Sequence, residues 1–282
     1  MKEYTADIYI KEKFELAESP FYLPKTGILS WVDITRGKAF FLSSSNRREE
    51  VAFEEEIGAM VPASDGGYVV AGTKGLYRCT VDKRERLRDL SSLFPSCQRC
   101  NDAKSDPAGR LFFGSSVRND HEPSGNLYCY DGSMIRILQR NTRIANGLAW
   151  SSDHRKFYFS DSLYHGIFSY DYDRNTGDIL NRRLLFSIEN GVPDGMCIDS
   201  KDHLWVAVWG GKRIEERDAE TGDLISVVHV DAANVTSCCF MGSNLDTLFI
   251  TTSGKDLSGE KEGCLYSCKV ETVGLEPDLL RL

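Results

Sequence analysis

The sequence of 282 residues lacks the features that direct a chain to a membrane, a secretory route or a nucleic acid. No apolar run approaches the about 20 residues that span a bilayer, and acidic side chains stand at the beginning in place of the apolar core of a signal peptide. The net charge is −8, and the one basic cluster, residues 83–88, is interrupted by Glu85. We interpret that cluster as a solvated loop. We therefore expect a cytoplasmic protein with no nucleic-acid or membrane partner.

Recognisable motifs for zinc, nucleotide phosphates and disulfides are also missing. Neither H-x-E nor H-E-x-x-H occurs, and the glycines at 210 and 211 lack the spacing of a phosphate-binding loop. The nine cysteines are odd in number and irregularly spaced, which favours small buried hydrophobes over a disulfide framework. Cys97 and Cys100 form a C-x-x-C without the second ligand pair that a structural zinc site requires.

Short strand patterns repeat along the whole chain, and no stretch keeps a helical periodicity over about 12 residues. Six units align on their first apolar residue, with separations of 39, 43, 46, 47 and 44 residues, at Leu29, Tyr68, Leu111, Phe157, Leu204 and Leu248. A period near this size with several strands per unit is typical of a β-propeller. The sequence thus predicts an all-β, six-bladed β-propeller that forms one domain over residues 1–282. A pair of β-sandwiches is the alternative, which the regular period disfavours.

Closure of such a ring requires the first and last blades to share strands. Two N-terminal stretches could complete the last blade, residues 8–10 or residues 13–16.

Polar residues recur at equivalent places in the repeats, next to the first strand of a unit. Pro193 and Gly195 flank Asp194, which we therefore expect on a stiff loop and not inside a strand. In a propeller the innermost strands run the same way along the axis, so residues just before them converge at one mouth of the channel. These residues are Glu18, Asn101, Asn146 and Asp194. Oxygen-only ligands favour Ca²⁺, Mg²⁺ or Mn²⁺ over Zn²⁺, although each residue alone could merely cap a turn.

Several motifs together resemble one family. They are Leu16-Ala17-Glu18-Ser19-Pro20-Phe21-Tyr22, Asn101-Asp102 with Asp106-Pro107-Ala108-Gly109-Arg110, Asn146-Gly147-Leu148-Ala149-Trp150, Pro193-Asp194-Gly195-Met196-Cys197-Ile198-Asp199, and Thr236-Ser237-Cys238-Cys239-Phe240. This set resembles the senescence-marker-protein/regucalcin/gluconolactonase family nearly end to end. The resemblance implies a metal-dependent hydrolase of sugar lactones on a six-bladed propeller.

The resemblance also implies roles for individual residues. Glu18, Asn146 and Asp194 would hold one divalent metal ion, while Arg99 and Asn101 would bind the substrate. Glu122 stands in the variable region where the family often places an acidic substrate-binding residue, although the local spacing here differs.

The main hypothesis is therefore a lactonase in which the metal polarises the lactone carbonyl and Asp194 also accepts a proton from water. The partner would be a small sugar lactone, and the protein a monomer or weak homo-oligomer. Two alternatives stay open: a non-catalytic propeller that binds calcium or another ligand, and an esterase or phosphotriesterase on the same scaffold.

Overall fold

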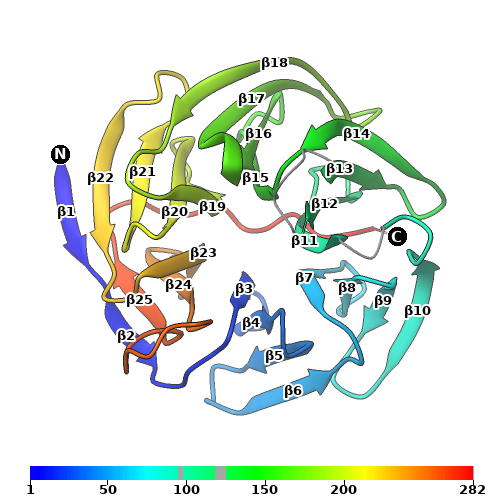
Figure 1. Cartoon of the computed structure of the whole chain (residues 1–282), viewed down its shortest axis with the longest axis horizontal. Helices are drawn as coiled ribbons and strands as arrows, with labels where there is room; N and C mark the ends of the chain where they lie inside the picture. Colours follow the sequence, from blue (N-terminus) through cyan, green and yellow to red (C-terminus); the bar gives the residue numbers. More distant parts are fainter. Residues whose placement is uncertain (95–97, 118–124, 282) are drawn as a thin grey trace.

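Four-stranded sheets stand around a central axis like the blades of a propeller in the computed structural model, which describes residues 1–94, 98–117 and 125–281 (Figure 1). Blades 1 to 4 each consist of four consecutive antiparallel strands. Blade 1 contains β3 (Ala17–Leu23), β4 (Ile28–Asp33), β5 (Lys38–Leu42) and β6 (Arg48–Ala52), and blade 2 contains β7 (Ile57–Pro62), β8 (Tyr68–Gly72), β9 (Gly75–Cys79) and β10 (Arg84–Asp89). Blade 3 contains β11 (Gln98–Ser105), β12 (Leu111–Val117), β13 (Gly125–Tyr130) and β14 (Ile135–Thr142), and blade 4 contains β15 (Ala145–Trp150), β16 (Lys156–Asp161), β17 (Gly166–Asp173) and β18 (Asp178–Ser187).

Blades 5 and 6 include the N-terminal strands. Blade 5 contains β19 (Val192–Ile198), β20 (His203–Trp209), β21 (Arg213–Asp218) and β22 (Leu224–His229), and β1 (Lys2–Thr5) extends it in parallel to β22. Blade 6 contains β23 (Asn234–Met241), β24 (Thr247–Ser253) and β25 (Leu265–Lys269), and its outermost strand is β2 (Asp7–Ile10). Residues 7–10 therefore close the ring, whereas residues 13–16, the other candidate for closure, form no strand.

The predicted repeat corresponds to the blades. All six residues on which the units were aligned are buried, and each lies in the second strand of its blade, in β4, β8, β12, β16, β20 and β24. The apolar core fills the spaces between neighbouring blades. Between blades 6 and 1, for example, Trp31 stacks on Phe40 at 5.3 Å between ring centroids and packs near Phe249 at 5.9 Å.

The innermost strand of every blade is interrupted at one place by a change of register against the second strand. The shifts fall between Glu18 and Phe21, Ile57 and Ala59, Cys100 and Ala103, Asn146 and Leu148, Pro193 and Met196, and Val235 and Ser237. A β-bulge bends its strand and redirects the side chains at the extra residue. The six bulges therefore lie at one level of the channel, near the N-terminal ends of the innermost strands.

Side chains also connect innermost strands of different blades. The Thr236 hydroxyl donates to the Ala17 carbonyl at 2.6 Å, and the Met60 amide donates to Ser19 Oγ at 3.1 Å. Asn101 Nδ2 donates to the Ala145 carbonyl at 3.0 Å. These bonds fix the relative positions of the strands that line the channel.

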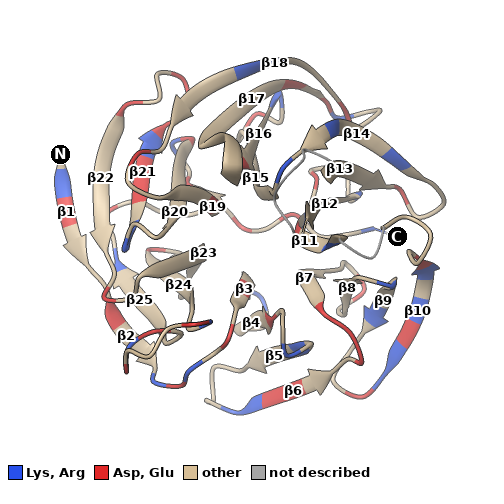
Figure 2. Ribbon diagram, viewed as in Figure 1, with Lys and Arg blue, Asp and Glu red and all other residues tan. Residues whose placement is uncertain are grey.

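The structure corrects one expectation about the surface and supports another. Residues 84–89 form strand β10 and not a loop, although all six residues are exposed as a solvated cluster should be. Basic residues of β10, β14 and β18 lie on the outer rim of the ring (Figure 2).

Within the described ranges the one helical element is the 3₁₀ turn η1 (Ser162–Tyr164), so no helix there is long and apolar enough to cross a membrane.

The segment after the last strand crosses the ring on one face. We call residues 270–281 the C-terminal strap. The Gly274 amide donates to the Leu245 carbonyl of blade 6, and the Leu280 amide donates to the Pro62 carbonyl of blade 2. The strap thus spans the end of the channel to which the innermost strands run (Figure 1).

Candidate metal centre

The predicted ligands lie inside the innermost strands and not in loops before them. Glu18 lies in β3, Asn146 in β15 and Asp194 in β19, each at the bulge of its strand. The prediction that Asp194 occupies a loop was wrong, because Val192 and Met196 on either side of it both pair with β20. The β-bulge between Pro193 and Met196 provides the irregular backbone that we expected from a loop.

A glycine allows two of these strands to approach each other. A Cβ atom on Gly147, the residue after Asn146, would lie 2.6 Å from the Asp194 carbonyl oxygen and 3.1 Å from the Met196 amide nitrogen. No larger residue fits at this contact between β15 and β19. The side chains of Asn146 and Asp194 therefore come together, and a hydrogen bond from Asn146 lowers the pKa of Asp194 in part.

Two carboxylates are buried at this level with little water to solvate them. Glu18 is 6% exposed and Asp194 is 7% exposed. Burial is the largest cause that raises the pKa of both groups, and the next is repulsion, from Asp194 for Glu18 and from Asp102 for Asp194. Holding like charges together in a low-dielectric site is unfavourable unless a cation or protons compensate them.

One amide oxygen at this level has no hydrogen-bond partner within the described chain. Asn146 Nδ2 donates to Ser162 Oγ at 3.1 Å, while Asn146 Oδ1 is buried and accepts no hydrogen bond within the described chain. Buried polar atoms are nearly always paired, so an unpaired amide oxygen beside two carboxylates is chemically suited to bind a cation. Carboxylate and amide oxygens are the donors that Ca²⁺, Mg²⁺ and Mn²⁺ prefer.

The predicted substrate-binding residues Arg99 and Asn101 are adjacent to this group. Arg99 donates to Asn101 Oδ1 at 2.7 Å and to the Cys100 carbonyl at 2.9 Å, so each orients the other. The charge of Arg99 also lowers the pKa values of Glu18 and Asp194 in part. Glu122, like Cys97 of the C-x-x-C motif, lies outside the described residues.

Asp102 is the third carboxylate of the site, and it was not among the residues predicted from the sequence. It is 4% exposed, its Oδ1 accepts the Ala103 amide at 2.8 Å, and its Oδ2 has no partner within the described ranges. Burial raises its pKa to about 6, while Lys104 opposes that shift. The available signal was the run of two polar residues, Asn101 and Asp102, both of which fall within one bulge.

A second group with metal-binding side chains consists of Asp199, His203 and Glu216 in blade 5. Its polar atoms are already used by the protein. The Asp199 carboxylate accepts hydrogen bonds from two backbone amides. It also accepts hydrogen bonds from two side chains, Trp205 Nε1 at 3.1 Å and the Thr272 hydroxyl at 2.9 Å. His203 Nδ1 lies 2.9 Å from Glu216 Oε1. This group connects the C-terminal strap to blade 5, and its bonding is that of a packing network.

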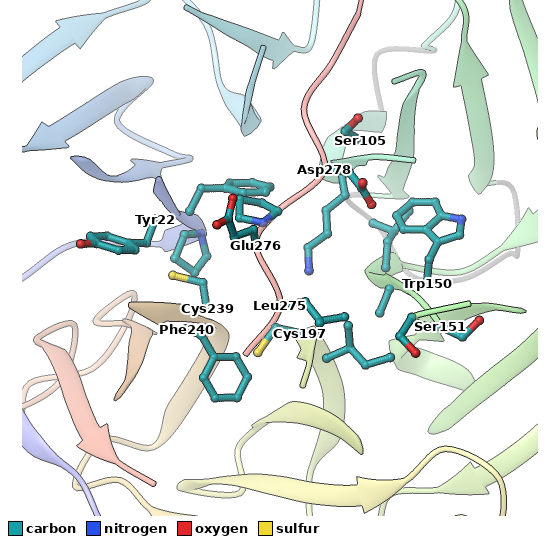
Figure 3. A pocket seen from close by; sticks show the side chains of 18 of the residues that line it. Tyr22, Ser105, Trp150, Ser151, Cys197, Cys239, Phe240, Leu275, Glu276 and Asp278 are labelled. Carbon is teal, nitrogen blue, oxygen red and sulfur yellow. The ribbon is translucent and has the colours of Figure 1, made fainter. Parts of the chain in front are cut away.

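The opposite end of the channel contains a cavity of about 250 Å³ beneath the strap (Figure 3). Its walls combine aromatic and sulfur-containing side chains with two acidic residues of the strap; they include Tyr22, Trp150, Cys197, Cys239, Phe240, Glu276 and Asp278. Lys104 also lines it, and Lys104 Nζ donates to the Met196 carbonyl at 2.5 Å, which connects β11 to β19. The C-terminal halves of the innermost strands line this cavity, so it is distinct from the carboxylate site near their N-terminal ends.

Comparison with known proteins gives consistent results over nearly the whole chain. The family model described as "SMP-30/Gluconolactonase/LRE-like region" matches residues 16–254. The chain is 37% identical over 286 residues to regucalcin of Danio rerio, with 98% of this chain and 96% of that protein covered. It is 31% identical over 276 residues to the putative sugar lactone lactonase YvrE of Bacillus subtilis (strain 168), with 93% and 94% covered.

A solved structure supports the fold. The calcium-binding protein regucalcin from Agrobacterium tumefaciens strain C58 superposes with a TM-score of 0.93 at 22% identity, and the match covers 100% of both chains. At 22% identity this similarity establishes the propeller fold only. The chemistry has to be argued from the residues of this chain.

Proposed function

Because the chain belongs to the SMP-30/gluconolactonase/LRE-like family, we propose that it is a divalent-metal-dependent hydrolase of sugar lactones. The observation that carries the proposal is the set of buried oxygen atoms on the innermost strands. Glu18 and Asp194 supply two carboxylates, and Asn146 Oδ1 supplies an amide oxygen without a partner. These three residues would hold the cation, with Ca²⁺, Mg²⁺ and Mn²⁺ favoured over Zn²⁺.

The cation and the residues around it would each have a separate role in the reaction. When bound, the metal supplies the Lewis acidity that polarises the lactone carbonyl. Arg99 and Asn101 would orient the sugar hydroxyls, and the Arg99 guanidinium would help to stabilise the negative charge that develops on the carbonyl oxygen. The proximity of Arg99 to Asn101 Oδ1, at 2.7 Å, fixes the two groups relative to each other before substrate binds.

Asp194 would accept the proton when water attacks the carbonyl carbon. The ring C–O bond then breaks, and the released oxygen takes up a proton to give the hydroxy acid. A bound cation lowers the pKa of a carboxylate and makes it a weaker base, whereas burial raises the pKa of Asp194. The two effects oppose each other at this residue.

The test is hydrolysis of aldonolactones after chelation and re-addition of single metals, followed by proton release. We expect one or more of Ca²⁺, Mg²⁺, Mn²⁺ and Zn²⁺ to restore turnover, and Asp194→Asn to reduce kcat/KM by about 10²–10⁴-fold. Asp223→Asn removes an exposed carboxylate in a turn of blade 5 and serves as the matched control. Turnover in Asp194→Asn equal to that of the Asp223→Asn control would contradict the assignment.

A second candidate function is a non-catalytic calcium-binding propeller, because a relative and a solved neighbour are named regucalcin, the latter as a calcium-binding protein. Calorimetric metal binding that depends on Glu18 and Asp194, with no turnover of any lactone, ester or phosphotriester, would favour this function. Turnover of simple esters or phosphotriesters in place of lactones would retain the site and change the substrate class.

A further inference from the structure

Two arginines pack on an exposed tyrosine at the rim of blade 4. The Arg143 guanidinium carbon lies 5.3 Å from the centroid of the Tyr164 ring, and that of Arg182 lies 6.0 Å from the same ring. Arg182 also lies 3.8 Å from the Phe168 centroid. Tyr164 is 44% exposed. Stacking on an aromatic face holds a guanidinium in place while leaving its edges available.

The tyrosine belongs to the turn that contacts the candidate metal ligands. Tyr164 ends η1, and Ser162 at the start of η1 accepts the hydrogen bond from Asn146 Nδ2. The same turn packs against β19, the strand of Asp194. His165 is the next residue, and its Nδ1 atom lies 3.2 Å from the carbonyl oxygen of Gly191, just before β19. The stacked arginines therefore lie on the face of the ring that carries the carboxylate site.

The guanidinium groups of Arg143 and Arg182 act on the buried Asp161 carboxylate only at a distance, where their charges lower its pKa in part. Arg143 and Arg182 form no ion pair within the described part of the chain, and Arg143 Nε is buried without a hydrogen-bond partner there. The nearby Asp161 carboxylate accepts the backbone amides of Arg143 and Ile144 at 3.2 Å. The hydrogen bonds of Asp161 are thus to the main chain, and no direct ion pair joins its carboxylate to the terminal nitrogens of Arg143, which can therefore bind a ligand.

We propose that Arg143, held by Tyr164, binds a carboxylate or phosphate group of the lactone substrate at the end remote from the lactone carbonyl. This inference rests on the proposed function and specifies its substrate class as anionic sugar lactones. Arg143 precedes Asn146 by three positions, which in an extended chain corresponds to a reach of about 10 Å, comparable to the length of a six-carbon sugar acid. A planar guanidinium binds both anions through paired hydrogen bonds.

Electrostatics explains why an anionic substrate needs such a group. The net charge of the chain is −8, and Glu18, Asp102 and Asp194 surround the place where the carbonyl would bind. An anionic lactone is repelled by this field until its charge is compensated. A cation at the rim compensates it at the end of the molecule away from the reaction. The Arg143 contact therefore acts mainly on substrate binding and KM.

The experiment compares three lactones at constant ionic strength: neutral glucono-δ-lactone, glucaro-1,4-lactone with a carboxylate, and 6-phosphoglucono-δ-lactone with a phosphate. The readout is the ratio of kcat/KM for each anionic lactone to that for the neutral one. We expect at least one ratio above unity in the unmodified protein and a fall of about tenfold in Arg143→Gln, mostly through KM. Arg143→Lys should retain part of the ratio. Arg155→Gln removes an exposed arginine from a turn at the other end of blade 4 and is the matched control.

The carboxylate and phosphate arms identify which anion the site accepts. Ratios at or below unity for both anionic lactones overturn the inference while leaving the lactonase intact. Equal ratios in Arg143→Gln and Arg155→Gln also overturn it. If no lactone is hydrolysed, the proposed function fails, and calorimetry with neutral glucitol, gluconate and glucitol 6-phosphate decides the inference separately. Tighter binding of either anion than of glucitol, lost in Arg143→Gln, supports the anion site; equal binding of all three compounds refutes it.

Discussion

Replacing Asp102 by Asn tests whether the buried carboxylate destabilises the metal-free fold. Asp102 is 4% exposed, and burial raises its pKa from 3.8 to about 6. A raised pKa means that the folded state binds the proton more tightly than the unfolded state does. The stability linked to this group is therefore full below about pH 4 and is lost as the pH rises to about 6.

The magnitude follows from the shift. A change of about two pKa units corresponds to about 3 kcal/mol of unfolding free energy. For a chain of 282 residues, that amount changes the midpoint of thermal unfolding by about 5 °C. The Asp102→Asn protein lacks this titration, so its stability between pH 4 and pH 8 should decline by about 3 kcal/mol less than that of the unmodified protein. Any fixed cost of the buried amide affects both ends of the range equally.

The assay is urea unfolding in the presence of a chelator, at intervals from pH 4 to pH 8. Asp131→Asn is the control, because that exposed carboxylate accepts amides of its own turn and its pKa is lowered, so its replacement should not flatten the profile. Parallel profiles for Asp102→Asn and the unmodified protein would refute the reasoning. They would mean that the carboxylate is solvated or compensated even without metal.

Two further predictions concern stability away from the carboxylate site. Asp106 is fully buried and accepts Arg110 Nε at 2.6 Å and the Tyr172 hydroxyl at 2.7 Å, so Asp106→Asn should lower the unfolding free energy by about 3–5 kcal/mol in denaturant titrations. A loss smaller than that caused by Tyr172→Phe would contradict this prediction, because it would show that other groups compensate the charge of Arg110. Leu280→Ala should remove about 2–5 kcal/mol, because this strap residue is fully buried against blades 2 and 3, while calorimetric metal affinity stays the same; an equal loss of metal affinity would contradict the separation of the two channel ends.

The repeat was readable from the sequence because each blade is one unit of turns and short apolar strands. Leu111 and Phe157, for example, follow clear turn signals and occupy equivalent second strands. The bulges were not readable. Pro193 and Gly195 locally indicate a loop, but hydrogen bonding to β20 on both sides of Asp194 makes the segment part of a strand.

The candidate site likewise has residues that the repeat predicted and contacts that it could not predict. Glu18, Asn146 and Asp194 were found because they recur at equivalent positions in the repeat, and their role as ligands stays a prediction. The Arg143–Tyr164 contact was missed because it joins residues from two sides of a hairpin with no shared pattern. The C-terminal strap was missed because its bonds are to distant turns, as with Arg281 and the Gly109 carbonyl.

The pairing of Ile8 with Tyr266 in blade 6 has a consequence for the order in which the protein can be made. A ribosome that adds about 5–20 residues per second needs roughly 13–50 s to reach residue 266. During that time β2 has no partner, and blade 1 has no neighbouring blade 6 to cover Trp31 of β4. The nascent chain therefore exposes the two flanks of an open ring until its final blade emerges, and truncation before β25 leaves both flanks exposed to other chains.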